Sequence, residues 1–95
     1  MTQQYLVGEL TLRLMQLQGS APNRESANEF ARLRRETEAA PVEALPTMTM
    51  RALRLVRGLC RESLARGDLM ALTHQATMAA DLREFAVSAS LIGED

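Results

Sequence analysis

The sequence predicts an all-α protein, an up-down antiparallel four-helix bundle that forms a single helical domain over residues 1–95. Apolar residues recur at helical spacing, and glycines and prolines interrupt this pattern at intervals typical of helix lengths. The chain is 46% apolar and 24% charged, which is typical of a globular protein. Because the links are short, consecutive helices are expected to lie antiparallel. The expected helices cover about residues 3–18, 22–40, 48–66 and 69–91, and residues 93–95 are expected to be a frayed C-terminal tail.

The first helix is expected over residues 3–18, where Leu10 and Leu14 belong to a helical apolar stripe. The run "LTLRLMQL" also alternates like a β-strand. We prefer a helix because a single strand would find no partner strand elsewhere in the chain. Tyr5 and Leu12 then project away from the stripe, which leaves the first helix with a second apolar face.

The second helix is expected over residues 22–40, with Pro22 in its first turn and Pro41 ending it. Phe30 and Leu33 belong to a thin apolar stripe, and most of the other positions are charged or polar. We therefore expect this helix on the outside of the molecule.

The third and fourth helices are expected to form a hairpin. Thr47 or Thr49 is a suitable N-cap for the third helix. Gly67 suits the left-handed residue after a helix, and Asp68 suits the N-cap of the next one. We therefore interpret Arg66-Gly67-Asp68 as a tight turn and not as a cell-adhesion motif. The fourth helix is apolar over more than half of its circumference, so we expect it at the centre of the core.

Arginines form a stripe along the third helix, opposite its apolar face. They are Arg51, Arg54, Arg57 and Arg61, and residues 48–67 carry a net charge of +4. Residues 68–95 carry −4. Three interpretations are open: a solvated face paired with acids of neighbouring helices, an interface with a protein that includes a second copy of the chain, or a nucleic-acid-binding surface.

Nucleic-acid binding is the least favoured of these interpretations. The whole chain carries a net charge of −1, it contains no lysine, and no aromatic residue alternates with the arginines. The absence of lysine is typical of GC-rich bacterial genomes. We expect the partner to be a protein, with a homodimer as the first hypothesis. The predicted interface consists of Tyr5, Leu12, Met50 and the arginine stripe Arg51, Arg54, Arg57 and Arg61.

The sequence contains no recognisable catalytic or metal-binding pattern. Cys60 is the only cysteine and His74 the only histidine, so an internal disulfide and a zinc site of the usual ligands are excluded. We expect Cys60 as a small buried residue and His74 at the surface. We predict no enzyme activity, no cofactor and no metal. The sequence has no signal peptide or membrane span, so we expect a cytoplasmic interaction or regulatory module.

Overall fold

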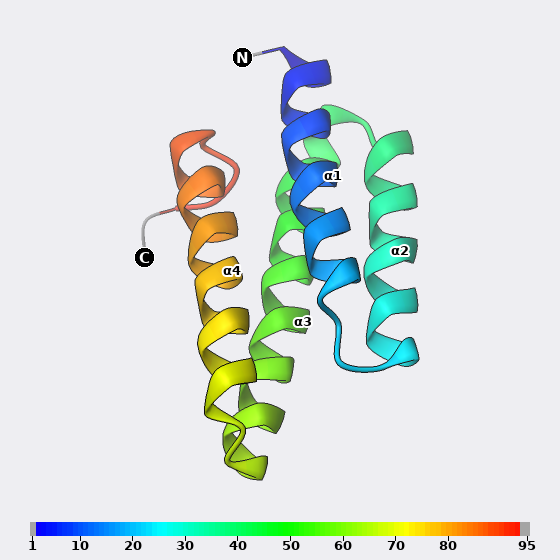
Figure 1. Ribbon diagram of the computed structural model, residues 1–95. Coiled ribbons are helices and arrows are strands. Elements are labelled where there is room, and N and C mark those ends of the chain that lie inside the picture. The colour runs from blue at the N-terminus through cyan, green and yellow to red at the C-terminus, as the bar shows by residue number, and fades with distance from the viewer. Residues whose placement is uncertain (1, 94–95) are drawn as a thin grey trace.

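A computed structural model describes residues 2–93, which form four α-helices and one short 3₁₀ helix (Figure 1). The predicted all-α, antiparallel four-helix architecture is confirmed. The predicted frayed tail, residues 93–95, lies outside the described residues from 94 onward. The elements are α1 (Gln3–Gly19), α2 (Arg24–Ala39), η1 (Val42–Ala44), α3 (Leu45–Arg66) and α4 (Leu69–Ser88).

The helices pair as two antiparallel hairpins, α1–α2 and α3–α4, and packing is closest within each hairpin. The α3–α4 hairpin extends beyond α1–α2 at the end that carries its turn (Figure 1). The principal extents of the chain are 41, 28 and 16 Å, so the molecule is flat. A flat bundle has two broad faces, and these provide most of its accessible surface.

Side-chain caps determine where α1 and α2 begin. The Thr2 side chain accepts a hydrogen bond from the Tyr5 amide at 3.2 Å and begins α1. The prediction that the second helix begins at Pro22 is wrong, because Asn23 Oδ1 accepts from the Ser26 amide at 2.8 Å and acts as the N-cap.

Helix α3 begins at Leu45, earlier than predicted, and the prediction of a threonine N-cap is wrong. Pro46 occupies the first turn, where its missing amide hydrogen costs no helical hydrogen bond. Thr49 is fully buried, and its hydroxyl donates to the Leu45 carbonyl at 2.8 Å. Residues 45–47, which precede the predicted start of the third helix, therefore belong to its first turn. Leu45 itself is fully buried in the core.

The predicted tight turn between α3 and α4 is confirmed. Gly67 adopts the left-handed conformation with φ of 71°, and Asp68 accepts from the Ala71 amide at 3.1 Å. The end of α4 was predicted wrongly at residue 91. The helix ends at Ser88, and Ser90 has a positive φ of 60°, which reverses the chain so that Leu91 packs back onto the core.

The core lies between the two hairpins. Its fully buried large side chains come from all four long helices of the described residues, and they include Leu10, Leu14, Phe30, Leu53 and Leu82. The prediction that the fourth helix is the centre of the core is wrong for its first half. There Leu69 is 66% exposed and Met70 87% exposed, because α1–α2 does not extend along this part of α3–α4.

A buried polar pair joins α3 to α4 near this uncovered end. The Ser63 hydroxyl donates to Gln75 Oε1 at 2.7 Å, and both residues are buried. Arg66 Nη2 also donates to the Ser63 hydroxyl, at 3.4 Å. Because the Ser63–Gln75 bond pairs polar groups that are buried from water, it stabilises the hairpin. Sequence periodicity did not predict this contact.

Candidate interaction surfaces

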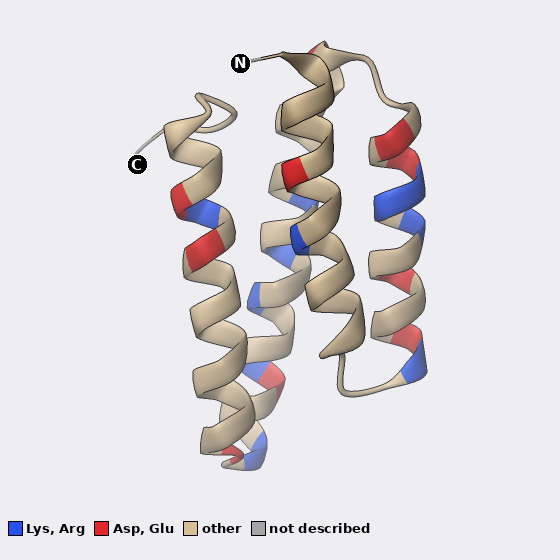
Figure 2. Cartoon of the chain, turned by 45° about the horizontal axis from the view of Figure 1, so that its top comes forward, with Lys and Arg blue, Asp and Glu red and all other residues tan. Residues whose placement is uncertain are grey.

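Charged residues are distributed unequally among the helices. Helices α2 and α3 carry eight and six of them, whereas α1 and α4 carry two and three (Figure 2). This division gives the molecule two contrasting surfaces. We call the outward sides of α1 and of the first half of α4 the neutral face. We call the outward side of α3, with Arg51, Arg54, Arg57 and Arg61, the arginine face.

The α1 part of the neutral face exposes three large apolar side chains. Tyr5 is 51% exposed, Leu12 49% and Met15 54%. With Gly8 they follow a spacing of three, four and three residues, which is the spacing of a coiled-coil seam. A Cβ added at Gly8 would meet nothing within 4 Å, so a second helix can approach the backbone closely at this point. The α1 side of the neutral face therefore has the pattern of an unpartnered helix interface.

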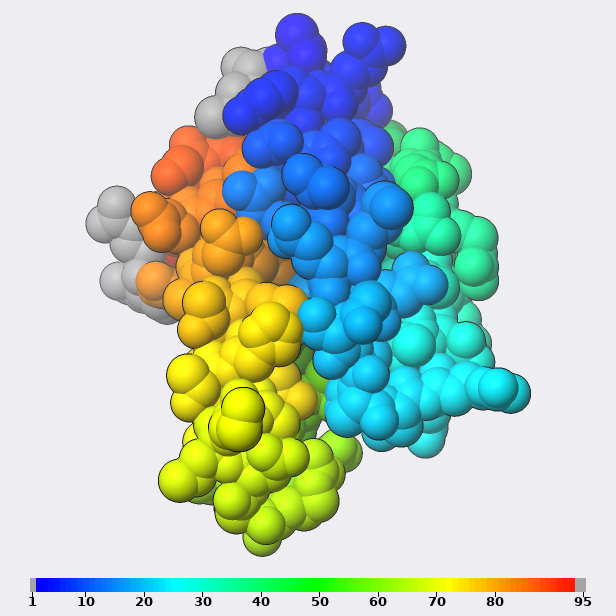
Figure 3. Space-filling view, in the orientation of Figure 1, coloured from blue at the N-terminus to red at the C-terminus, as the bar shows by residue number. Residues whose placement is uncertain are grey.

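The α4 part of the neutral face continues from the end of α1, and the two parts lie side by side in Figure 3 (blue and yellow). The His74 ring nitrogen Nε2 lies 3.2 Å from the Ser20 hydroxyl and connects them. No charged residue occurs between Asp68 and Asp81. A shallow hollow of about 500 Å³ lies on this surface, lined by Leu69, Met70, Thr73, His74 and Thr77.

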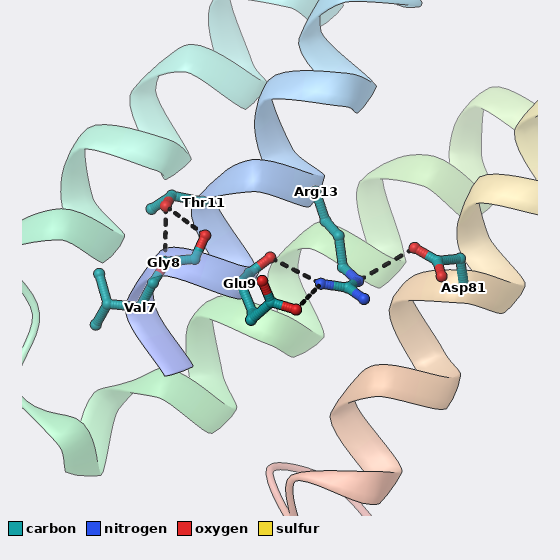
Figure 4. Close-up of polar contacts among 6 residues, drawn as sticks. All are labelled: Val7, Gly8, Glu9, Thr11, Arg13 and Asp81. Carbon is teal, nitrogen blue, oxygen red and sulfur yellow. Dashed lines mark hydrogen bonds and ion pairs between the residues drawn. The ribbon is translucent and has the colours of Figure 1, made fainter. Parts of the chain in front are cut away.

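Threonines on the neutral face satisfy their hydroxyl groups within their own helices. The Thr11 hydroxyl donates to the carbonyls of Val7 and Gly8 at 2.8 and 3.1 Å (Figure 4). The Thr73 and Thr77 hydroxyls bond to carbonyls one turn earlier in α4, at 2.8 and 2.9 Å. These hydroxyls need no partner from outside, so covering them with an apolar surface has a small desolvation cost.

Arg13 pairs with two carboxylates beside the neutral face, those of Glu9 and Asp81 (Figure 4). Its Nη1 lies 3.3 Å from Glu9 Oε1, and its Nε lies 3.1 Å from Asp81 Oδ2 on α4. The Asp81 contact is an ion pair that lacks the alignment of a hydrogen bond at Nε. The guanidinium also lies 4.3 Å from the centre of the Phe85 ring, a cation–π contact. Arg13 thus links the two hairpins.

The sequence interpretation missed this cluster. Glu9 and Arg13 are four residues apart, beside the buried leucine stripe, and that spacing was a signal for their own pair. Nothing in the local sequence indicated Asp81 or Phe85, which α4 brings to Arg13 only through the packing of the hairpins.

The arginine face is neutralised at one end only. Arg51 Nη1 lies 2.6 Å from Glu36 Oε2 of α2. Arg54, Arg57 and Arg61 are exposed and form no ion pair with any carboxylate of residues 2–93. The acidic residue of α4 that does pair, Asp81, pairs with α1. Within the described residues, the negative fourth segment therefore leaves the positive third helix uncompensated.

The predicted interface residues are divided between the two faces. Tyr5 and Leu12 are exposed on α1, which lies in front of α3 in Figures 1 and 2. The arginine stripe lies on α3. Met50 was expected to be exposed within the stripe, but it is half-buried and packs against the core. Its angle on the helix alone therefore did not predict the exposure of Met50.

The two residues considered for chemistry lie on different helices, Cys60 on α3 and His74 on α4. Cys60 is half-buried rather than fully buried, and burial raises the pKa of its thiol above the ordinary value, which keeps the thiol protonated near neutral pH. His74 is exposed, as predicted.

Across residues 2–93, no three His, Cys, Asp or Glu side chains gather as a metal site would require. No helix in the described range combines the length and apolarity that crossing a membrane demands.

Comparison with protein-family models, with curated proteins and with solved structures gave no match to this chain.

Proposed function

We propose that this protein is a non-enzymatic interaction module in which two copies associate through the neutral face. The single observation that carries this proposal is the exposed seam of Tyr5, Gly8, Leu12 and Met15, beside which the carboxylates of Glu9 and Asp81 are already paired with Arg13. Exposed apolar residues gathered in one patch mark interfaces far more often than residues scattered singly.

Self-association favours the neutral face over the arginine face for an electrostatic reason. When a surface meets its own copy across a two-fold axis, a row of like charges near the axis faces the same row in the other copy. Arg54, Arg57 and Arg61 would repel their counterparts in such a contact, whereas the neutral face brings none. The arginine face therefore remains available for a different partner.

Light scattering combined with size exclusion, at low and high salt, tests this proposal. We expect a dimer whose mass is insensitive to salt, because an apolar contact is not screened. Leu12→Glu should give a monomer with an unchanged circular dichroism spectrum, since the side chain is half-exposed and contributes little to the fold. Asn28→Glu, at an exposed position of α2, introduces the same charge and should remain dimeric.

A wild-type monomer under all conditions would overturn self-association. A dimer that dissociates at high salt, and that Leu12→Glu does not affect, would move the interface to the charged helices.

Nucleic-acid binding stays the second hypothesis, supported by the three unpaired arginines. Glu25, Glu29 and Glu62 lie around the same surface, however, and line a hollow with Arg54. Carboxylates at that position repel a phosphate backbone, so a protein partner is better supported.

A further inference from the structure

A groove runs between α2 and α3, beside the arginine face. It consists of two adjoining hollows of about 340 and 200 Å³, which share Glu29, Arg54 and Leu55 in their linings. The two helices belong to different hairpins and pack less closely than the helices within each hairpin. The groove therefore follows the junction of the two hairpins.

The floor of the groove is apolar and open. Leu33 comes from α2, and Leu55 and Leu59 come from α3. Gly58, one helical turn from both Arg54 and Glu62, also lines it, and an added Cβ would meet nothing within 4 Å. Glycine in a helix interior costs about 1 kcal/mol relative to alanine. Internal packing does not require glycine here, so its effect is to leave the groove unfilled.

The charges around the groove differ between its two sides. Glu25 and Glu29 come from α2. On α3, Arg54 and Glu62 line the groove. Arg57 and Arg61 continue from Arg54 at one-turn spacing, outside this lining, without carboxylate partners among residues 2–93. An occupant that matches this arrangement carries carboxylates toward the three arginines, an apolar stripe toward the floor and no acidic group toward Glu62.

We infer that this groove binds an acidic amphipathic helix of a second protein, with its apolar stripe on Leu55 and its carboxylates paired with Arg54, Arg57 and Arg61. Helix-in-groove recognition uses this combination of an apolar floor and a charged rim. The inference rests on the proposed function as an interaction module, but it does not depend on self-association.

Two other occupants are less suitable. A second copy of this chain would have to offer an unpaired acidic helix. Asp81 of its α4 is paired with Arg13 and the first half of α4 is uncharged, whereas its α2 carries four arginines beside its four glutamates. A nucleic-acid backbone would place phosphates against Glu25 and Glu29. An acidic helix that presents cationic or polar side chains toward α2 and Glu62 avoids both difficulties.

The test uses a fluorescein-labelled synthetic peptide of roughly 14 residues, about the length that spans α3 from Arg51 to Glu62 at 1.5 Å per residue. The peptide carries leucines at i, i+3 and i+7, with glutamates along one flank. Fluorescence anisotropy with the full chain measures the Kd. A matched peptide with lysines in place of the glutamates is the charge control.

We expect the glutamate peptide to bind and the lysine peptide to bind at least about tenfold more weakly. Gly58→Leu, which fills the floor, and the double variant Arg54→Glu plus Arg57→Glu should each weaken binding of the glutamate peptide by about tenfold or more. The matched controls are Ala80→Leu on the exposed side of α4 and Arg32→Glu plus Arg35→Glu on the exposed side of α2, and both should leave the Kd unchanged.

Failure of the glutamate peptide to bind, or equal binding to Gly58→Leu, would overturn the groove inference. A labelled DNA duplex that binds with dependence on Arg54 and Arg57 but not on Gly58 would assign the face to nucleic acid instead. Leu12→Glu separates the two proposals: a monomeric variant that still binds the peptide confirms the groove independently of the dimer. A wild-type dimer that ignores the peptide leaves self-association intact and removes the groove.

Discussion

The neutral face, on α1 and α4, and the arginine face, on α3, belong to one bundle, but their polar groups find partners in different ways. On the neutral face, Thr11 and Thr73 bond to their own helices, and Arg13 is shared between two carboxylates. On the arginine face, Arg54 and Arg57 extend into solvent without carboxylate partners among residues 2–93.

This difference shows how little the net charge of −1 says about the surface of the chain. A surface whose polar groups are satisfied internally loses little when an apolar surface covers it. A surface with unpaired charges gains most from a partner of opposite charge. The molecule therefore combines one face suited to its own copy with another suited to a different protein.

The largest expected effect concerns the hairpin that supports parts of both faces. Ser63→Ala removes the donor to Gln75 Oε1 and leaves a buried amide oxygen unpaired. We expect the free energy of unfolding in urea to fall by about 1–3 kcal/mol. Adding Gln75→Leu should recover most of this loss, because both polar partners are then gone. Ser88→Ala, at an exposed site, is the control and should change stability by less than about 0.5 kcal/mol. Equal losses in the single and double variants would show that the pair does not support the hairpin in this way.

A smaller loss of stability is expected when the arginine of an ion pair is removed, and its effect on the dimer distinguishes the two faces. Arg13→Ala leaves Glu9 and Asp81 uncompensated and removes the contact with Phe85. We expect a loss of roughly 1–2 kcal/mol in urea unfolding and weaker self-association, since each copy then brings two unpaired carboxylates to the neutral face. Arg51→Ala breaks an exposed pair with Glu36, so it should cost less than about 1 kcal/mol and leave the dimer intact. Equal effects of the two variants on the dimer would contradict the division into faces.

The smallest effect is expected from two glycines in comparable positions, Gly8 and Gly58. Each lies within a helix with open space at its Cβ position, so Gly8→Ala and Gly58→Ala should each stabilise the fold by about 0.5–1 kcal/mol. Only Gly8→Ala should weaken the dimer, because it separates the two backbones at the seam. Thermal unfolding and light scattering on the same samples measure both quantities. If the dimer is equally tight in both variants, the two α1 helices do not approach each other closely at Gly8.

Local sequence features determined the secondary structure. Apolar spacing placed the helices, Gly67 and Asp68 placed the turn between α3 and α4, and arginine spacing placed the stripe on the outward side of α3. Each of these features acts within one or two helical turns, so each is visible in a short window of sequence. The start of the third helix was placed too late because proline is compatible both with a linker and with a first helical turn, and Pro46 lies in such a turn.

Only the tertiary structure decided which apolar and charged residues are covered. Met70 and Leu82 are both apolar residues of α4, yet Met70 is 87% exposed and Leu82 is fully buried. The difference depends on how far the α1–α2 hairpin reaches along α3–α4, a property that neither helix carries in its own sequence. Arg13 meets Asp81 and Phe85 for the same reason, and the α2–α3 groove exists because the hairpins meet there less closely than their own helices do. Burial and charge pairing between distant segments depend on how the two hairpins dock, so local periodicity cannot predict them.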